Sequence, residues 1–278
     1  MALPLTPATS APHTPHPVRA SRRQRRCLWQ PGCSSCLRTK EFLTKQGIDF
    51  ESIDVHNDPT GMDKLRALGA RSVPVVALGG KFTMCQSFND VIKFLDLKTK
   101  LMDPLPPEQL VAKLDIVLQT TIRLIQQFKP EQLRENFRNR NRNPAGTAFH
   151  IFRVAQMGVE AAHQIDLKFE SFNEVAPDDW NASDLAKWGE TVRVELLAWW
   201  AKEDNRSLDY LVSTYYGRRT MHDVFERTAW HAAQHTRPTS RVCVASWSPG
   251  KPVLPPAWHV VEPFARIGPT PLIEGSIS

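Results

Sequence analysis

The chain has 278 residues, of which 41% are hydrophobic and 23% are charged, and its formal net charge is +6. This length predicts two domains of ordinary size. The sequence has no run of about 18 uncharged apolar residues, which argues against a membrane-spanning helix. The positive charge comes from residues 1–26, which hold five arginines and no acidic residue. The rest of the chain is close to neutral, so we expect no basic surface for nucleic acid.

The N-terminal residues and the cysteine content indicate a compartment. Residues 1–25 lack the apolar core of a secretory signal, and we expect them to form a disordered basic extension. Five cysteines in a chain of this length do not make a disulfide scaffold. Such cysteine usage fits a reducing compartment, which predicts a cytoplasmic protein.

Residues 26–97 alternate short β-type runs with helical runs. Strands are predicted at 27–29, 50–55, 73–78 and 81–84, and helices at 34–46, 59–69 and 88–95. Gly79 and Gly80 provide the tight turn between the last two strands. The order βαβαββα is typical of a mixed α/β layer fold.

Cys33 and Cys36 form a CxxC motif that follows the first predicted strand and opens the first predicted helix. The positive end of the helix dipole and its free N–H groups stabilise a thiolate at Cys33, which lowers its pKa. Cys36 is then the resolving thiol. The alternatives are half of a zinc site or two ordinary thiols, but the sequence has no second CxxC to complete a zinc site.

From about Cys27 to Leu97 the sequence resembles the glutaredoxin family, which has a thioredoxin-like fold. The resemblance rests on the CxxC motif and on residues 72–75, Ser-Val-Pro-Val. It implies that Pro74 is a cis-proline and that the backbone at Val73 pairs with a bound thiol or peptide. The alternative for Pro74 is an ordinary proline at the start of a strand.

The same resemblance places Asn89 and Asp90 where glutaredoxins contact the glycyl carboxylate of glutathione. The alternative is that Asp90 only caps its helix. Glutathione is therefore the expected cofactor, with glutathione or protein disulfides as partners. The tetrapeptide Cys-Ser-Ser-Cys departs from the aromatic-containing form of the classical members, which leaves substrate preference and redox potential open.

The remaining sequence changes to a helical period. Residues 98–107 contain three prolines and are the predicted linker. Four amphipathic helices are predicted within 108–237, at about 110–128, 145–163, 183–199 and 220–237, with Ser183 as the N-cap of the third. Four such helices imply an all-α four-helix bundle. Pro238 should end the last helix, and residues 238–278 should form an irregular, proline-rich tail.

Three histidines lie at inward positions of this bundle. His231 and His235 are one turn apart on the last helix and continue its apolar stripe, as His150 does on the second helix. Three imidazoles from two helices can bind one divalent metal and leave coordination positions open. Zinc, nickel, iron and copper all accept imidazoles, and we expect zinc or nickel. The alternative is a solvated or core histidine pair without a metal.

The segment from Thr214 to Arg237 resembles the DinB-like superfamily of metal-binding four-helix bundles, and the likeness covers about residues 108–237. Members hold a divalent metal with one histidine of the second helix and an HxxxH pair of the last helix. The resemblance implies that His150, His231 and His235 hold the metal. The bundle is also a candidate surface for a homodimer.

Other polar residues of the bundle are expected to lie away from this site. His222 and His163 are out of phase with the three histidines and should face outward. Glu195 interrupts the stripe of the third helix, and an exposed position is expected for it.

Three functions remain open from the sequence. The first is a glutaredoxin-like thiol-disulfide oxidoreductase with a fused DinB-like, metal-binding bundle. The second is a glutathione-dependent, metal-assisted transferase or isomerase in which the thiol module is accessory. The third is a non-catalytic metal or thiol sensor.

Overall fold

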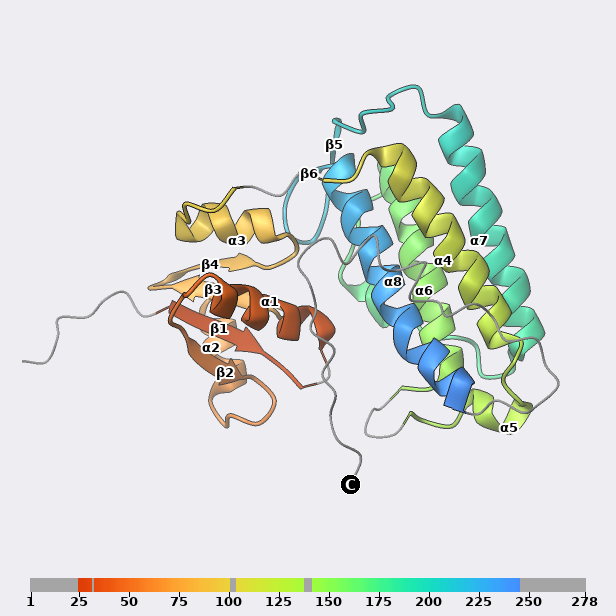
Figure 1. Ribbon diagram of the computed structural model, residues 1–278, viewed down its shortest axis with the longest axis horizontal. Helices are drawn as coiled ribbons and strands as arrows, with labels where there is room; N and C mark the ends of the chain where they lie inside the picture. Colours follow the sequence, from red (N-terminus) through yellow and green to blue (C-terminus); the bar gives the residue numbers. More distant parts are fainter. Residues whose placement is uncertain (1–24, 32, 101–103, 138–141, 246–278) are drawn as a thin grey trace, which may run out of the picture.

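The computed structural model describes residues 25–245 except 32, 101–103 and 138–141, and it gives only the backbone of Ser34 and of residues 237–245. An α/β module (residues 25–97) and a helical module (residues 104–245) lie side by side (Figure 1). This confirms the predicted fold class, a thioredoxin-like sheet with its helices followed by an all-α bundle. None of the helices in the described part of the chain is long and apolar enough to span a membrane.

The α/β module contains a four-stranded sheet in the order β2-β1-β3-β4. Its strands are β1 (Arg25–Trp29), β2 (Glu51–Asp54), β3 (Val75–Leu78) and β4 (Lys81–Met84). β1 runs parallel to β2 and antiparallel to β3, and Cys27 pairs with Ser52 and Val76. The turn between β3 and β4 includes Gly79, whose positive φ of 62° favours glycine.

Helices cover both faces of this sheet (Figure 1). Successive residues of a strand point to opposite faces, so Cys27 and Leu28 belong to different cores. Cys27 packs in the core with α1 (Ser34–Lys45) and α3 (Phe88–Leu95). Leu28 packs in the core with α2 (Gly61–Ala67). These two cores fix the position of β1, which ends at Trp29, shortly before the CxxC motif begins at Cys33.

The helical module is built on four long helices. They are α4 (Pro107–Ile125), α6 (Pro144–Ala162), α7 (Ala182–Lys202) and α8 (Met221–Ala245). α4 and α6 each pack against both α7 and α8, and one continuous hydrophobic core fills the space between them. Its largest fully buried side chains include Leu114, Phe152, Leu196 and Phe225.

Short elements connect these helices: α5 (Pro130–Leu133), the 3₁₀ helix η1 (Glu170–Asn173), β5 (Leu211–Val212) and β6 (Arg219–Thr220). The predicted N-cap at Ser183 was wrong. Asn181 caps α7, since its side-chain oxygen accepts hydrogen bonds from the backbone N–H groups of Ser183 and Asp184 at 2.7 and 3.2 Å.

The last helix is longer than expected. α8 continues to Ala245, so the prediction that Pro238 ends it was wrong. A proline inside a helix removes one backbone donor and crowds the carbonyl four residues earlier, but the turns on either side keep their hydrogen bonds. The predicted basic extension, up to residue 24, and the predicted tail from residue 246 onward lie outside the described residues.

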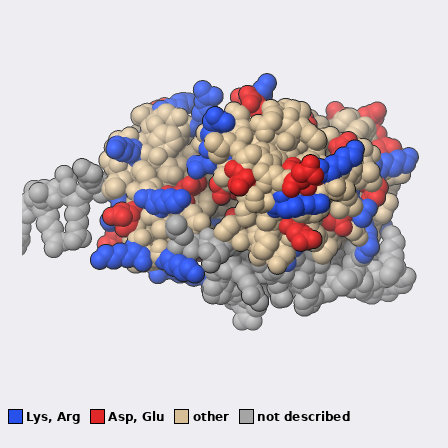
Figure 2. Space-filling view, turned by 90° about the horizontal axis from the view of Figure 1, so that it is seen from above, with Lys and Arg blue, Asp and Glu red and all other residues tan. Residues whose placement is uncertain are grey.

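The two modules contact each other through α1, the start of α3, and α8. The guanidinium of Arg38 lies between the rings of Phe88 and Trp230, 4.3 and 4.5 Å from their centroids. Arg227 of α8 donates a hydrogen bond from Nε to the side-chain oxygen of Gln86. On the face shown in Figure 2, acidic and basic side chains are interspersed over the described surface.

Candidate redox and metal sites

The CxxC motif lies at the start of α1, directly after β1. Cys33 is the N-cap residue of this helix, and its sulfur accepts a hydrogen bond from the backbone N–H of Cys36 at 3.2 Å. A backbone N–H directed at the sulfur stabilises a thiolate, as does the positive end of the helix dipole. Cys33 and Cys36 are joined in a disulfide.

The two sulfurs differ in their access to solvent. Cys33 is partly exposed, whereas Cys36 is fully buried behind it. The other described cysteines are buried too, and burial raises the pKa of Cys27 to about 12 and that of Cys85 further still. The arrangement suits Cys33 as the attacking thiol and Cys36 as the thiol that resolves a mixed disulfide.

Val73 and Pro74 lie before β3, and the peptide bond between them is cis, as the glutaredoxin resemblance implies. Pro74 is buried, and its carbonyl accepts a hydrogen bond from the backbone N–H of Cys85 at 3.1 Å. This bond ties the start of β3 to the end of β4. The contact of Val73 with a bound thiol stays a prediction.

Asn89 and Asp90 lie in the first turn of α3, but neither is its cap. Ser87 caps the helix, since its hydroxyl accepts from the backbone N–H of Asn89 at 3.1 Å. Asp90 instead forms an ion pair with Arg219 of the helical module. Burial raises the pKa of the Asp90 carboxyl, and Arg219 opposes that rise. A contact of Asn89 or Asp90 with glutathione stays a prediction.

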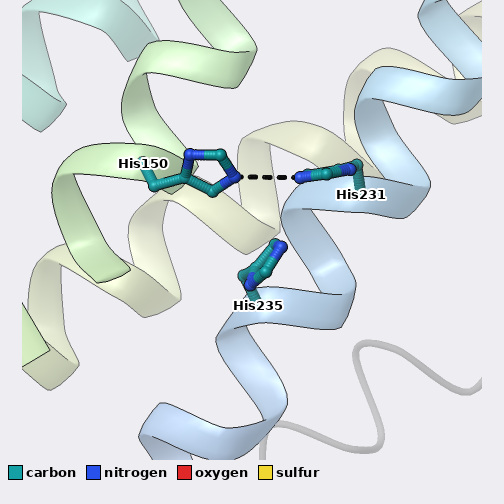
Figure 3. A group of neighbouring side chains, drawn as sticks. All are labelled: His150, His231 and His235. Carbon is teal, nitrogen blue, oxygen red and sulfur yellow. Dashed lines mark hydrogen bonds between the residues drawn. The ribbon is translucent and has the colours of Figure 1, made fainter. Parts of the chain in front are cut away.

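The structure brings the three predicted histidines together (Figure 3). His150 projects from α6 toward His231 and His235 of α8, and the Nε2 atoms of His150 and His231 are 3.0 Å apart. The nearest ligand atoms of all three lie within 4.8 Å of one another. The histidines meet because each continues the apolar stripe of its helix, and α6 packs against α8.

Two of these imidazoles, those of His150 and His231, have lowered pKa values. Burial lowers the pKa of His150 to about 4, and the charges of Arg142 and Arg227 lower it as well, while a hydrogen bond to the Phe172 backbone opposes this. Burial holds the pKa of His231 well below its usual range, and His235, Arg227, His150 and Arg142 lower it as well. Neutral imidazole is the form that binds a metal.

The donor set fits a divalent metal. Zinc–nitrogen bonds of about 2.0 to 2.1 Å place tetrahedral ligand atoms about 3.3 Å apart. The Nε2 atoms of His150 and His231 are 3.0 Å apart, close to that value, and the ligand atoms of all three histidines lie within 4.8 Å of one another. Three imidazoles could hold one divalent metal ion and leave coordination positions open. Within the described chain this group includes no carboxylate.

Other polar residues of the bundle lie where the sequence predicted. Glu195 and His163 are exposed. His222 faces away from the three histidines and donates a hydrogen bond from Nε2 to the backbone carbonyl of Leu105 at 2.7 Å.

Sequence reasoning missed two arginines at this site. Arg142 approaches His235, with 2.9 Å between Nη1 and Nδ1. Arg227 precedes His231 by one helical turn and donates to the hydroxyl of Tyr215 at 3.0 Å. The four-residue step from Arg227 to His231 was a readable signal, since it places both on one face. Arg142 had no such signal, because it lies in a loop.

Comparison with known proteins identifies the α/β module. Residues 23–83 match the Glutaredoxin family. Gene 56 protein of Mycobacterium phage L5 is 46% identical over 48 residues, which are 17% of this chain and 47% of that protein. Glutaredoxin-like protein NrdH of Escherichia coli (strain K12) is 43% identical over 47 residues, 17% of this chain and 58% of NrdH. The chain thus spans about half the length of these two relatives.

Two further known proteins align with a larger share of this chain. A crystal structure of a mycothiol-dependent maleylpyruvate isomerase variant aligns with a TM-score of 0.39 and 13% identity, covering 51% of this chain and 62% of that one. An uncharacterized glutaredoxin-like 8.6 kDa protein from the rubredoxin operon of Clostridium pasteurianum is 30% identical over 67 residues, 24% of this chain and 89% of that protein. Through its α/β module, the chain belongs to the glutaredoxin-like proteins.

Proposed function

We propose that the α/β module is a thiol-disulfide oxidoreductase in which Cys33 attacks and Cys36 resolves. The observation that supports this most directly is the pairing of a partly exposed Cys33 at the start of α1 with a fully buried Cys36 beside it. Val73, Pro74, Asn89 and Asp90 would bind the thiol partner. Glutathione is the proposed reductant.

The reaction transfers two electrons. The Cys33 thiolate attacks one sulfur of a substrate disulfide, forming a mixed disulfide and releasing the first thiol. The Cys36 thiolate then attacks the Cys33 sulfur, which releases the second thiol and forms the Cys33–Cys36 disulfide. Two molecules of glutathione return the pair to the dithiol and leave as glutathione disulfide.

Reduction of a small disulfide, coupled to glutathione turnover, tests this proposal. Cys33→Ser should abolish turnover, whereas Cys36→Ser should accumulate a mixed disulfide whose added mass is seen by mass spectrometry. Cys27→Ser is the matched control, because Cys27 lies in the core and should leave turnover intact. Turnover that survives Cys33→Ser would refute the proposal.

We further propose that His150, His231 and His235 hold a divalent metal, zinc or nickel, in a DinB-like bundle. The resemblance of residues 214–237 to that superfamily and the closeness of the three imidazoles support this. A bound metal would act as a Lewis acid and lower the pKa of a coordinated water or thiol. A glutathione-dependent, metal-assisted transferase or isomerase is therefore the second candidate function.

Elemental analysis of the purified full chain tests the metal. About one equivalent should be present in the wild type and lost in His231→Ala. His163→Ala is the control, because that exposed histidine points elsewhere. A metal content unaffected by His231→Ala would contradict this assignment. Disulfide reduction that survives His231→Ala would show that the redox activity does not need the metal.

A further inference from the structure

A groove of about 690 Å³ lies between β4 of the α/β module and two loops of the helical module. Residues 82–84 of β4 form one wall, and residues 166–170 and 213–216 form the other. The two loops are held together by backbone hydrogen bonds of 3.1 and 2.9 Å, in which the N–H of Leu167 donates and its carbonyl accepts. Because both modules supply a wall, neither module forms this groove alone.

The groove follows the open edge of the sheet. β4 is the last strand in the order β2-β1-β3-β4. Successive side chains of a strand point to opposite faces of the sheet. Three consecutive residues of β4, 82–84, nevertheless all line the groove. The groove therefore runs beside the strand, where its backbone is, and does not lie on one face of the sheet.

Three backbone groups of β4 are left to pair with a ligand at this edge. In an antiparallel pair, residues that exchange hydrogen bonds alternate with residues whose backbone groups point away from the partner strand. The N–H of Cys85 donates to the carbonyl of Pro74 at 3.1 Å. The register therefore directs the backbone groups of Phe82 and Met84 away from β3. The Met84 carbonyl is used in the following turn, but the N–H and C=O of Phe82 and the N–H of Met84 have no partner among the described residues.

The size and the lining of the groove suit an extended peptide. The spacings within and between sheets give each residue of a strand about 160 Å³, so the groove has room for about four residues. The opposite wall includes the rings of Phe169 and Tyr215, whose centroids are 5.4 Å apart. These rings offer apolar contact to side chains, while the edge of β4 offers hydrogen bonds to a backbone.

The groove begins at the end of the sheet that carries the CxxC motif. Leu28 of β1 pairs with Val75, and Val75 pairs with Met84, so the ends of β1 and β4 lie at the same edge. Arg71, two residues before Val73, also lines the groove. A strand added beside β4 would lie three strand spacings from β1, about 14 Å, which four or five extended residues span.

We propose that this groove binds an extended segment of a protein disulfide substrate as an additional strand beside β4. The segment follows the reactive cysteine by about four residues. This direction is expected because antiparallel pairing is the more stable kind, and β4 runs toward the CxxC end of the sheet. The inference rests on the proposed thiol-disulfide activity, and it makes the helical module one wall of the substrate site.

Reduction of two matched disulfides by the full chain, with glutathione as reductant, tests this. The long probe is the peptide Cys-Gly-Gly-Gly-Gly-Val-Thr-Val-Thr, joined through its cysteine to 2-mercaptoethanol, and the short probe lacks Val-Thr-Val-Thr. The wild type should reduce the long probe with a kcat/KM at least about tenfold higher, as expected for two or three added hydrogen bonds. N-methylation of both valines or of both threonines should remove this preference in one of the two cases only, because alternate backbone groups of a strand face opposite ways.

Two variants of Phe82 separate backbone pairing from the loss of its ring. Phe82→Pro removes the N–H that points into the groove and no hydrogen bond to β3, so it should abolish the preference for the long probe. Phe82→Val also removes the ring but keeps the N–H, and it should retain most of the preference. Both variants should reduce the short probe as the wild type does. If Phe82→Pro does not fold, the N-methylated probes decide the question on the wild type.

The opposite wall is tested in the same assay. Phe169→Ala should lower the preference for the long probe, and Val175→Ala, at an exposed position outside the groove, should keep it. Equal reduction of the two probes by the wild type, or equal effects of the two N-methylations, would overturn this inference and leave the redox proposal intact. A wild type that reduces neither probe would refute the redox proposal, and this inference with it.

Discussion

The guanidinium of Arg219 lies 3.2 Å from the carboxylate of Asp90, and this ion pair links β6 of the helical module to α3 of the α/β module. Both side chains are largely shielded, with 31% and 18% of their surfaces exposed. The resemblance to glutaredoxins predicted that Asp90 contacts glutathione. In the structure its carboxylate already pairs with Arg219 of the helical module. The helical module therefore adjusts the charge at the edge of the predicted thiol site.

Arg219→Gln should destabilise the protein at pH 7 and much less near pH 4. Burial raises the pKa of Asp90 in the folded state, so the ionised carboxylate is disfavoured there. The contribution of this group to the free energy of unfolding therefore falls as the pH rises through that pKa. Without Arg219 the pKa rises further, which adds a penalty wherever the carboxyl is ionised. The expected loss is about 0.5–1 kcal/mol at neutral pH, measured by urea unfolding.

The double variant with Asp90→Asn isolates the pair. In that background Arg219→Gln should cost little at either pH, because no carboxylate remains to be left unpaired. The buried Nε of Arg219 has no hydrogen-bond partner among the described residues, which keeps the net value of the pair small. If Arg219→Gln lowers the free energy of unfolding equally at both pH values, Arg219 acts through packing rather than through the charge of Asp90.

Limited alkylation of the reduced protein should modify Cys33 first. Its sulfur is partly exposed and accepts the Cys36 N–H, whereas Cys27, Cys36 and Cys85 are buried. Because the thiolate is the reacting form, the raised pKa values of Cys27 and Cys85 slow them further. Peptide mapping after substoichiometric iodoacetamide measures this order. Similar labelling of these four cysteines in the native state, as in a denatured control, would contradict it.

Glu226→Gln should raise the melting temperature at neutral pH. Burial raises the pKa of Glu226, and Asp223 raises it too, while His222 and Arg38 oppose the shift. The ionised carboxylate therefore costs stability above this pKa, and the cost disappears at acid pH where the group is protonated. The gain should be modest, since Glu226 keeps some contact with solvent. Glu195→Gln, at an exposed position, should leave the melting temperature unchanged. An equal rise in melting temperature there would show that the change in net charge causes the effect.

The spacing of apolar residues predicted the helices and strands, and it predicted that the three histidines lie close together. It does so because an apolar stripe shows which face of an element is buried. The order βαβαββα and the inward direction of His150 both follow from such patterns. The hydrogen bond between Gln86 and Arg227 had no comparable signal, because it depends on how two modules dock across 141 residues of sequence. The continuation of α8 through Pro238 was missed for a different reason. A proline weakens a helix locally, and the packing of the long helix decides whether it ends there.

Gly189→Ala should destabilise the helical module where α6 crosses α7. A methyl group at Gly189 would lie 2.5 Å from the fully buried ring of Phe152, far closer than van der Waals contact. Overpacking of this kind costs about 1–3 kcal/mol, which exceeds the gain of up to about 1 kcal/mol from replacing a helical glycine. Gly80→Ala, which meets nothing within 4 Å, is the control. In the Gly189→Ala background, Phe152→Leu should lower the free energy of unfolding by less than it does in the wild type, since the smaller side chain relieves the overlap. If the two effects are strictly additive, the ring moves aside freely and this helix contact is loosely packed.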